Sequence, residues 1–167
     1  MIGLSHDGVR KETTVDGTLV LVLDNTLDAI EGGRLRILRL LGPRALSART
    51  INRLEVIFEE LVSNVIRHGF TAEAERSILV TVGAGPDCIQ LTVEDDGKPF
   101  NPFEVDAAPE FDSLETVRVG GLGIPVVRRF STSATYEAGP ASAAWSEMVA
   151  KGGRPINRVR VEIAAQA

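Results

Sequence analysis

The sequence predicts an α+β fold, a two-layer sandwich in which helices cover one face of a mixed, mostly antiparallel sheet. Two observations lead to this class. A helical layer comes before most of the strands, and the clearest strand pairs are joined by short turns, as antiparallel strands allow. The 167 residues contain no internal repeat or linker, so we expect a single domain, with residues 1–17 and 164–167 peripheral to it.

A hairpin is expected at the start of the chain. Asp16-Gly17 is a turn signal, and it lies between residues 12–15 and the continuous apolar run of residues 19–23. The sequence therefore predicts two paired strands here.

Two helices are expected after the hairpin. The first spans residues 26–41, where apolar residues recur at helical spacing, although Gly32-Gly33 is an unfavourable pair for a helix interior. The second spans residues 47–68, which carry an apolar stripe, and Gly69 follows in the position of a C-terminal cap.

The second half of the chain alternates strands with loops. Residues 97–120 contain three prolines, five acidic residues and no sustained periodicity, which predicts a long loop. The other expected elements are strands over residues 78–82, 89–93, 132–137 and 157–163, a short helix over residues 124–130 and a helical turn near residues 145–149.

Composition excludes several classes of function. The net charge of −5 argues against a nonspecific nucleic-acid binder. Cys88 is the only cysteine, so an internal disulfide is impossible, and one thiol with two histidines does not make a zinc centre of the usual spacing. No apolar run approaches the about 20 residues needed to cross a bilayer and no secretory signal is visible, so a cytoplasmic protein is expected.

Glu60 and Asn64 form the first candidate site. Four residues apart on the predicted helix, they lie side by side at the flank of the apolar stripe. The Asn64 oxygen suits a magnesium ion otherwise held by phosphates and water, and Glu60 suits the activation of a hydroxyl nucleophile. The alternative is a polar helix flank with a local hydrogen bond.

Asp95 is the second candidate. It shares a strand face with apolar residues and is therefore expected to point inward at the strand end. A buried carboxylate needs a donor, and the exocyclic amine of adenine would supply one. The alternative is that Asp95 accepts backbone N–H bonds in the Asp96-Gly97 turn.

The third candidate is the glycine run Gly120-Gly121-Leu122-Gly123. It precedes a predicted helix, so its backbone N–H groups and the positive helix end suit a phosphate. The alternative is a flexible hinge. Arg118, just before the run, is placed to reach a terminal phosphate.

In order, these three motifs resemble those of the bacterial anti-sigma factor serine/threonine kinases, which belong to the superfamily of gyrase, histidine-kinase and MutL ATP-binding domains. The likeness covers about residues 18–163 and is strongest over residues 58–69, 93–100 and 120–124. It implies the Bergerat ATP-binding fold, ATP and Mg²⁺ as cofactors, and residues 98–119 as an ATP lid.

The resemblance also implies roles for the matched residues. Asn64 would coordinate magnesium and Glu60 would act as general base. Asp95 would contact adenine, with Gly97 giving it room. Gly121, Leu122 and Gly123 would form the phosphate cradle. Two departures stand out: Pro99-Phe100 replaces a second glycine often found after the aspartate motif, and residues 139–153 are longer than the usual hairpin, which bears on the partner surface.

Three functions are compared. The first is an ATP-dependent kinase that phosphorylates a serine of an anti-sigma factor antagonist and thereby regulates a sigma factor, as the resemblance implies, with a homodimer as its assembly. The second is a nucleotide-dependent protein-binding module without kinase activity; Glu60 favours the kinase, because binding alone needs no base. The third, the ATP-binding half of a histidine kinase, calls for a preceding helix with a phosphoacceptor histidine, which we do not expect in this chain.

Overall fold

The computed structural model describes residues 7–69, 76–104, 123–149 and 154–165. Their strands form one six-stranded sheet in the order β1-β2-β3-β4-β6-β5, in which every neighbouring pair is antiparallel. The sheet is therefore not mixed over these residues. The strands are β1 (Val9–Val15), β2 (Thr18–Asp24), β3 (Ser77–Ala84), β4 (Cys88–Asp95), β5 (Ser133–Gly139) and β6 (Ile156–Ala164).

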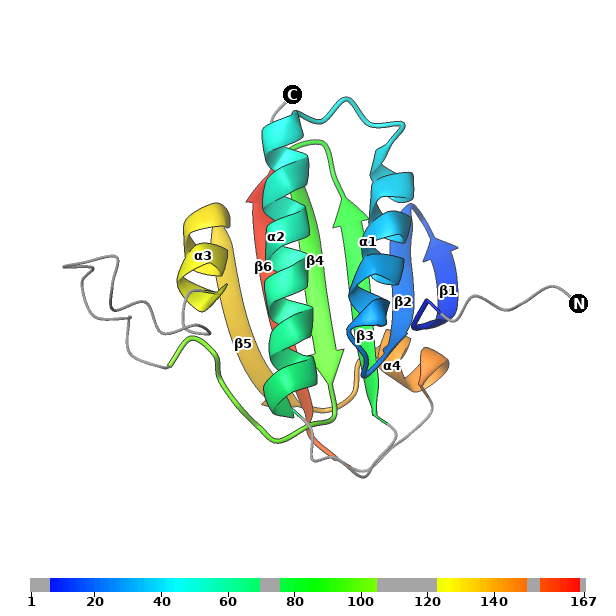
Figure 1. Cartoon of the computed structure of the whole chain (residues 1–167), viewed down its shortest axis with the longest axis vertical. Helices are drawn as coiled ribbons and strands as arrows, with labels where there is room; N and C mark the ends of the chain where they lie inside the picture. The colour runs from blue at the N-terminus through cyan, green and yellow to red at the C-terminus, as the bar shows by residue number, and fades with distance from the viewer. Residues whose placement is uncertain (1–6, 70–75, 105–122, 150–153, 166–167) are drawn as a thin grey trace, which may run out of the picture.

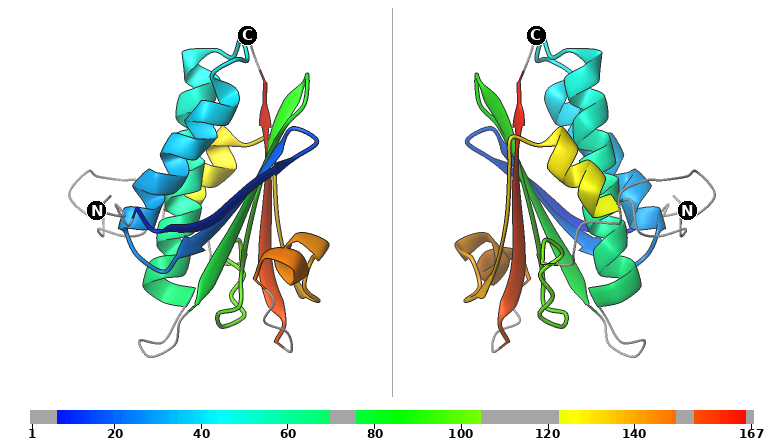
Figure 2. Two further views of the ribbon diagram at one scale, coloured as in Figure 1. Left: turned by 90° about the vertical axis from the view of Figure 1, so that its right-hand side faces the viewer. Right: turned by 90° about the vertical axis from the view of Figure 1, so that its left-hand side faces the viewer.

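Helices α1 (Asp28–Leu41), α2 (Ala48–Asn64) and α3 (Gly123–Phe130) lie on one face of the sheet, as Figures 1 and 2 show. The short helix α4 (Ala143–Met148) lies against the opposite face. The prediction of an α+β sandwich is confirmed, but helices are not confined to one face.

Helix α4 covers an apolar patch on the outer face of the sheet. Its Trp145 is fully buried and packs in a cluster with Val20, Val22, Leu79 and Ile156. These strand residues alternate with those that face the main core, so without α4 they would meet water. The apolar run of β2 is continuous because both of its faces are covered.

A buried ion pair also anchors α4. Ser142 caps the helix by accepting a hydrogen bond from the Trp145 N–H (3.0 Å), and its hydroxyl donates to the Glu94 carboxylate (2.8 Å). Arg158 donates to the other oxygen of Glu94 at 2.8 Å. Glu94 and Arg158 are 2% and 7% exposed, so this pair is buried under the helix.

The first hairpin forms as predicted. Asp16 and Gly17 have φ angles of 49° and 76°, which is the left-handed geometry of a two-residue turn with both central residues at positive φ. Val15 then pairs with Thr18, and the register continues to the pair of Lys11 with Val22, beyond which it shifts before Val9.

Gly32 and Gly33 make close packing of α1 possible. Both are buried, and a Cβ at Gly32 would collide with the Asp7 carbonyl oxygen. A Cβ at Gly33 would lie 2.7 Å from Cζ of Phe58, a core residue of α2 that is 1% exposed. The pair that is unfavourable for an isolated helix thus lets α1 approach its neighbours.

Helix α2 does not end on a glycine cap, contrary to the prediction for Gly69. Ser47 caps its start by accepting from the Thr50 N–H at 3.2 Å. At its end the helix widens into a π-helical turn, η1 (Val65–Gly69), and Gly69 is not among the residues with positive φ. The Gly69 carbonyl instead accepts a hydrogen bond from the Lys98 N–H (3.1 Å), so a distant segment satisfies the helix end.

No helix in the described part of the chain is both long enough and apolar enough to cross a membrane.

We predict that Gly33→Ala lowers the free energy of unfolding by about 1–3 kcal/mol, the usual range for overpacking a core. Helix propensity alone would make the alanine variant more stable by about 1 kcal/mol. A net loss of stability would therefore come from the clash with Phe58. Urea unfolding measures the difference. Gly139→Ala is the control, because its Cβ would meet nothing within 4 Å; equal stabilities for both variants would contradict the prediction.

Candidate functional site

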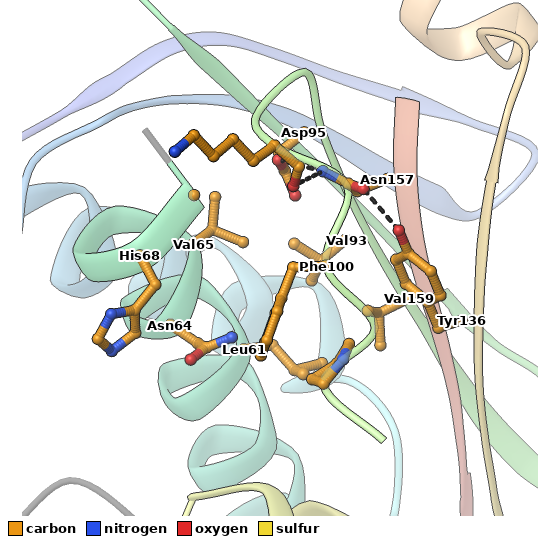
Figure 3. Close-up of a pocket in the computed structure, with 13 residues that line it drawn as sticks. Leu61, Asn64, Val65, His68, Val93, Asp95, Phe100, Tyr136, Asn157 and Val159 are labelled. Carbon is orange, nitrogen blue, oxygen red and sulfur yellow. Dashed lines mark hydrogen bonds between the residues drawn. The ribbon is translucent and has the colours of Figure 1, made fainter. Parts of the chain in front are cut away.

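A pocket lies between the end of α2, the turn η1 and the strands β4, β5 and β6 (Figure 3). Its apolar walls come from Leu61 and Val65 on the helix side and from Val93 and Val159 on the sheet. Two of the residues singled out from the sequence, Asn64 and Asp95, line the same pocket. The chemistry of this lining complements an apolar group with a polar edge.

Asp95 is the last residue of β4 and is 6% exposed. One of its oxygens, Oδ1, accepts hydrogen bonds from the Gly97 N–H (2.8 Å) and from Nδ2 of Asn157 (3.0 Å). Burial raises the pKa of Asp95, and these two hydrogen bonds oppose that rise. Neither bond uses Oδ2, so this oxygen can accept a donor from a ligand. The two alternatives drawn from the sequence are compatible, because the turn bond and the inward direction occur together.

The sequence patterns did not indicate Asn157 as a site residue. It faces Asp95 across the β4–β6 pair and is 6% exposed. Its Nδ2 donates to Asp95 and to the Lys98 carbonyl (3.0 Å), and its Oδ1 accepts from the Tyr136 hydroxyl (2.8 Å). The only available signal was a polar residue at the head of an inward-facing apolar series, and the strand register was needed to interpret it.

Position 97 requires a glycine because the backbone there packs closely against the backbone of Gly69. A Cβ at this position would collide with the Gly69 carbonyl oxygen and lie 2.7 Å from Asp95 Oδ1. The bare α-carbon therefore lets the turn after β4 lie directly on the end of η1. This contact shapes the polar end of the pocket.

Asn64 and Glu60 lie one turn apart on α2, as expected. Asn64 faces the pocket in Figure 3, whereas Glu60 is not among the residues that line it. The Glu60 carboxylate lies at the start of α3, where a Cβ on Gly123 would collide with it. The structure thus places Asn64 with Asp95, and Glu60 with the last glycine of the glycine run.

Gly123 is the first residue of α3, and Pro125 is accommodated in its first turn. Arg118, Gly121 and Leu122 lie outside the described residues, as does the predicted loop beyond residue 104.

Residues 98–104, here called the pocket wall, close one side of the pocket. Phe100 and Pro102 line it from this segment, as does Lys98, whose carbonyl accepts a hydrogen bond from Asn157. Tyr136 and His68 complete the lining from β5 and η1. Burial raises the pKa of Tyr136, whose hydroxyl is the donor to Asn157.

The donor set suits a magnesium ion held mainly by a ligand. Among the described residues, no three His, Cys, Asp or Glu side chains gather as a metal centre. Magnesium often takes one protein oxygen and completes its shell with phosphates and water. Asn64 offers such an oxygen on the pocket side of α2.

Comparison with known families identifies the domain. Residues 23–144 match the histidine kinase-like ATPase domain family. The chain belongs to this family. The family assignment agrees with the antiparallel sheet, the helices on its inner face and the pocket between them.

Individual relatives of this ATPase-family domain are distant. The chain is 26% identical to the serine/threonine-protein kinase BtrW of Bordetella bronchiseptica over 54% of its own length and 64% of that protein. It is 25% identical to the serine-protein kinase RsbW of Listeria innocua, over 66% of the chain and 73% of that protein. It is 21% identical to the anti-sigma F factor of Bacillus velezensis, over 54% of the chain and 62% of that protein. The match therefore spans less than two thirds of BtrW and of the anti-sigma F factor.

The raised pKa of Asp95 gives a testable pH dependence. The folded protein binds the Asp95 proton more tightly than the unfolded chain does. The protonated side chain therefore stabilises the fold fully below its unfolded pKa of about 3.9. This stabilisation is lost as the pH rises through the raised pKa of the folded state. An asparagine at this position would keep an oxygen for both hydrogen bonds without a buried charge. We expect Asp95→Asn to be more stable than wild type at pH 7, with an advantage that shrinks toward pH 4.

Urea unfolding at the two pH values measures this difference. The matched control is Asp87→Asn, which removes an exposed carboxylate and is expected to leave both stabilities near those of wild type. An Asp95→Asn variant less stable than wild type at pH 7 would refute the assignment of a destabilising buried charge.

Proposed function

We propose that this domain binds ATP with Mg²⁺ and acts as a serine/threonine protein kinase of the anti-sigma factor type. The observation that carries the proposal is the buried Asp95 carboxylate, whose Oδ2 is left available in a pocket that Asn64 also lines. Glu60 lies one helical turn from Asn64. The names of the relatives, two protein kinases and an anti-sigma factor, support the same activity.

Asp95 would select the base. Its two hydrogen bonds already fill Oδ1, so Oδ2 would accept the exocyclic amine of adenine. Guanine would present a carbonyl oxygen at the equivalent position, and two acceptors cannot hydrogen-bond. Val65, Val93 and Val159 supply apolar surface for the faces of the purine.

Glu60 and Asn64 would act at the other end of the nucleotide. Bound ATP would supply the phosphoryl group, with Mg²⁺ neutralising its charge. Asn64 would offer an oxygen to the metal, and Glu60, beside Gly123 at the start of α3, would accept the proton of the substrate hydroxyl. We further propose that Gly121, Leu122 and Gly123 hold phosphates, that Arg118 reaches the terminal phosphate, and that residues 98–119 form the lid.

The proposed substrate is a serine on an anti-sigma factor antagonist, with a sigma factor as second partner and a homodimer as the assembly. A nucleotide-dependent binding module is the alternative. The specific observation that favours the kinase is the Glu60 carboxylate, which is close to α3 and outside the base pocket, where nucleotide binding alone has no use for it.

The first test is nucleotide binding. At a free ATP concentration of about one hundred times Kd, binding stabilises a protein by about 2.7 kcal/mol, which for this chain length raises Tm by about 5–10 °C. We expect MgATP to produce this shift in wild type and not in Asn64→Ala or Asp95→Asn, each compared with its own ligand-free protein. Equal shifts in all three proteins would remove the site assignment.

The second test separates enzyme from binding module. Incubation with radiolabelled ATP and antagonist proteins from neighbouring genes is expected to label a serine. Glu60→Gln keeps the shape of the side chain without its basicity, so it should retain the Tm shift and lose about 100-fold or more in the rate of labelling. A wild type that binds ATP yet labels no antagonist would favour the module.

A further inference from the structure

The pocket wall has no helix or strand to hold it, so its position depends on tethers. At its first end, the Lys98 N–H donates to the Gly69 carbonyl at 3.1 Å. The Lys98 carbonyl accepts from Asn157 Nδ2 at 3.0 Å. This end is therefore fixed directly to the elements that hold Asp95.

Arg128 of α3 holds the other end. Its guanidinium donates to the Phe103 carbonyl at 2.6 Å and lies 5.2 Å from the centroid of the Phe103 ring. One side chain thus makes a hydrogen bond and a cation–π contact with the same residue. Arg128 does not line the pocket, so it acts on the pocket through the wall.

The segment next to this tether is a compact turn. Asn101 accepts the Phe103 N–H on its side chain (3.0 Å) and the Glu104 N–H on its backbone carbonyl (3.3 Å). Holding Phe103 therefore holds the whole turn, including Pro102, which lines the pocket. Phe100, between the two tethers, lines the pocket while 48% exposed, so a bound apolar group would cover more of it.

We propose that Arg128 is a positioning residue for the nucleotide pocket: by pinning Phe103 it keeps the wall in its binding position before the nucleotide arrives. This inference rests on the proposed nucleotide binding. A wall that is already ordered costs less conformational entropy on binding, and apparent affinity scales with the fraction of molecules in the competent state.

Equilibrium binding of ATP and of ADP to the full chain tests the inference. Losing one hydrogen bond and one cation–π contact is expected to weaken binding by about tenfold in Arg128→Ala. The loss should be equal for ATP and ADP, because Phe100 and Pro102 line the pocket proposed for the base, which both nucleotides share. Arg128→Lys keeps a donor for the Phe103 carbonyl, so its affinity for each nucleotide should lie between those of wild type and Arg128→Ala.

Arg129 provides the matched control. It is the next residue of α3, is exposed, and makes no hydrogen bond or ion pair with the described residues, so Arg129→Ala should bind like wild type. Hydrogen exchange in the ligand-free proteins adds a readout independent of nucleotide. The Phe103 and Glu104 amides should exchange faster in Arg128→Ala and not in Arg129→Ala.

The outcomes separate this inference from the proposed function. Wild-type affinity in Arg128→Ala, or a loss confined to ATP, would overturn the positioning role while leaving nucleotide binding intact. Unchanged exchange at Phe103 and Glu104 would also overturn it. Failure of wild type to bind either nucleotide would instead refute the proposed function.

Discussion

The carboxylate of Asp95 is the constraint on which the pocket depends. A charged group that is 6% exposed must be compensated by donors, and here the two donors come from strand β6 and from the turn after β4. Gly97 donates directly, and Asn157 donates while Tyr136 fixes the orientation of its amide. The close approach of Gly69 to Gly97 then places the end of η1 against the same group. Shifting any of these elements would leave a buried charge without its partners.

The neighbouring residues of the same strands carry a second buried polar pair. Asp95 faces Asn157 on the helix side of the sheet, whereas Glu94 faces Arg158 on the side of α4. Side chains alternate between the faces of a strand, so two adjacent cross-strand pairs serve the pocket and the anchoring of α4. A shift of one residue in the register between β4 and β6 would turn the side chains of one strand to the opposite face, so neither pair could form. Both polar pairs therefore fix the register at the end of the sheet where the pocket lies.

Much of the fold followed from local patterns. The Asp16-Gly17 turn, the stripe of α2 and the alternation of β3 and β4 each act over a few residues, and all formed as expected. The prediction failed where a distant segment intervened. Helix α2 continues into η1 instead of ending on a cap at Gly69, whose carbonyl meets the distant Lys98 N–H. Helix α4 lies on the second face, where Trp145 fills an apolar patch assembled from three strands.

The candidate site shows the same difference between local patterns and long-range contacts. The sequence alone determined the types and order of the chemical groups at Glu60, Asn64 and Asp95, since helix spacing and strand alternation fix which way neighbouring side chains point. Only the tertiary structure decided that Asn157 meets Asp95, that Glu60 lies beside Gly123 and does not line the pocket, and that Arg128 holds Phe103. These contacts join residues that are 25 or more positions apart, and such pairings depend on strand register and helix packing, which no local pattern encodes.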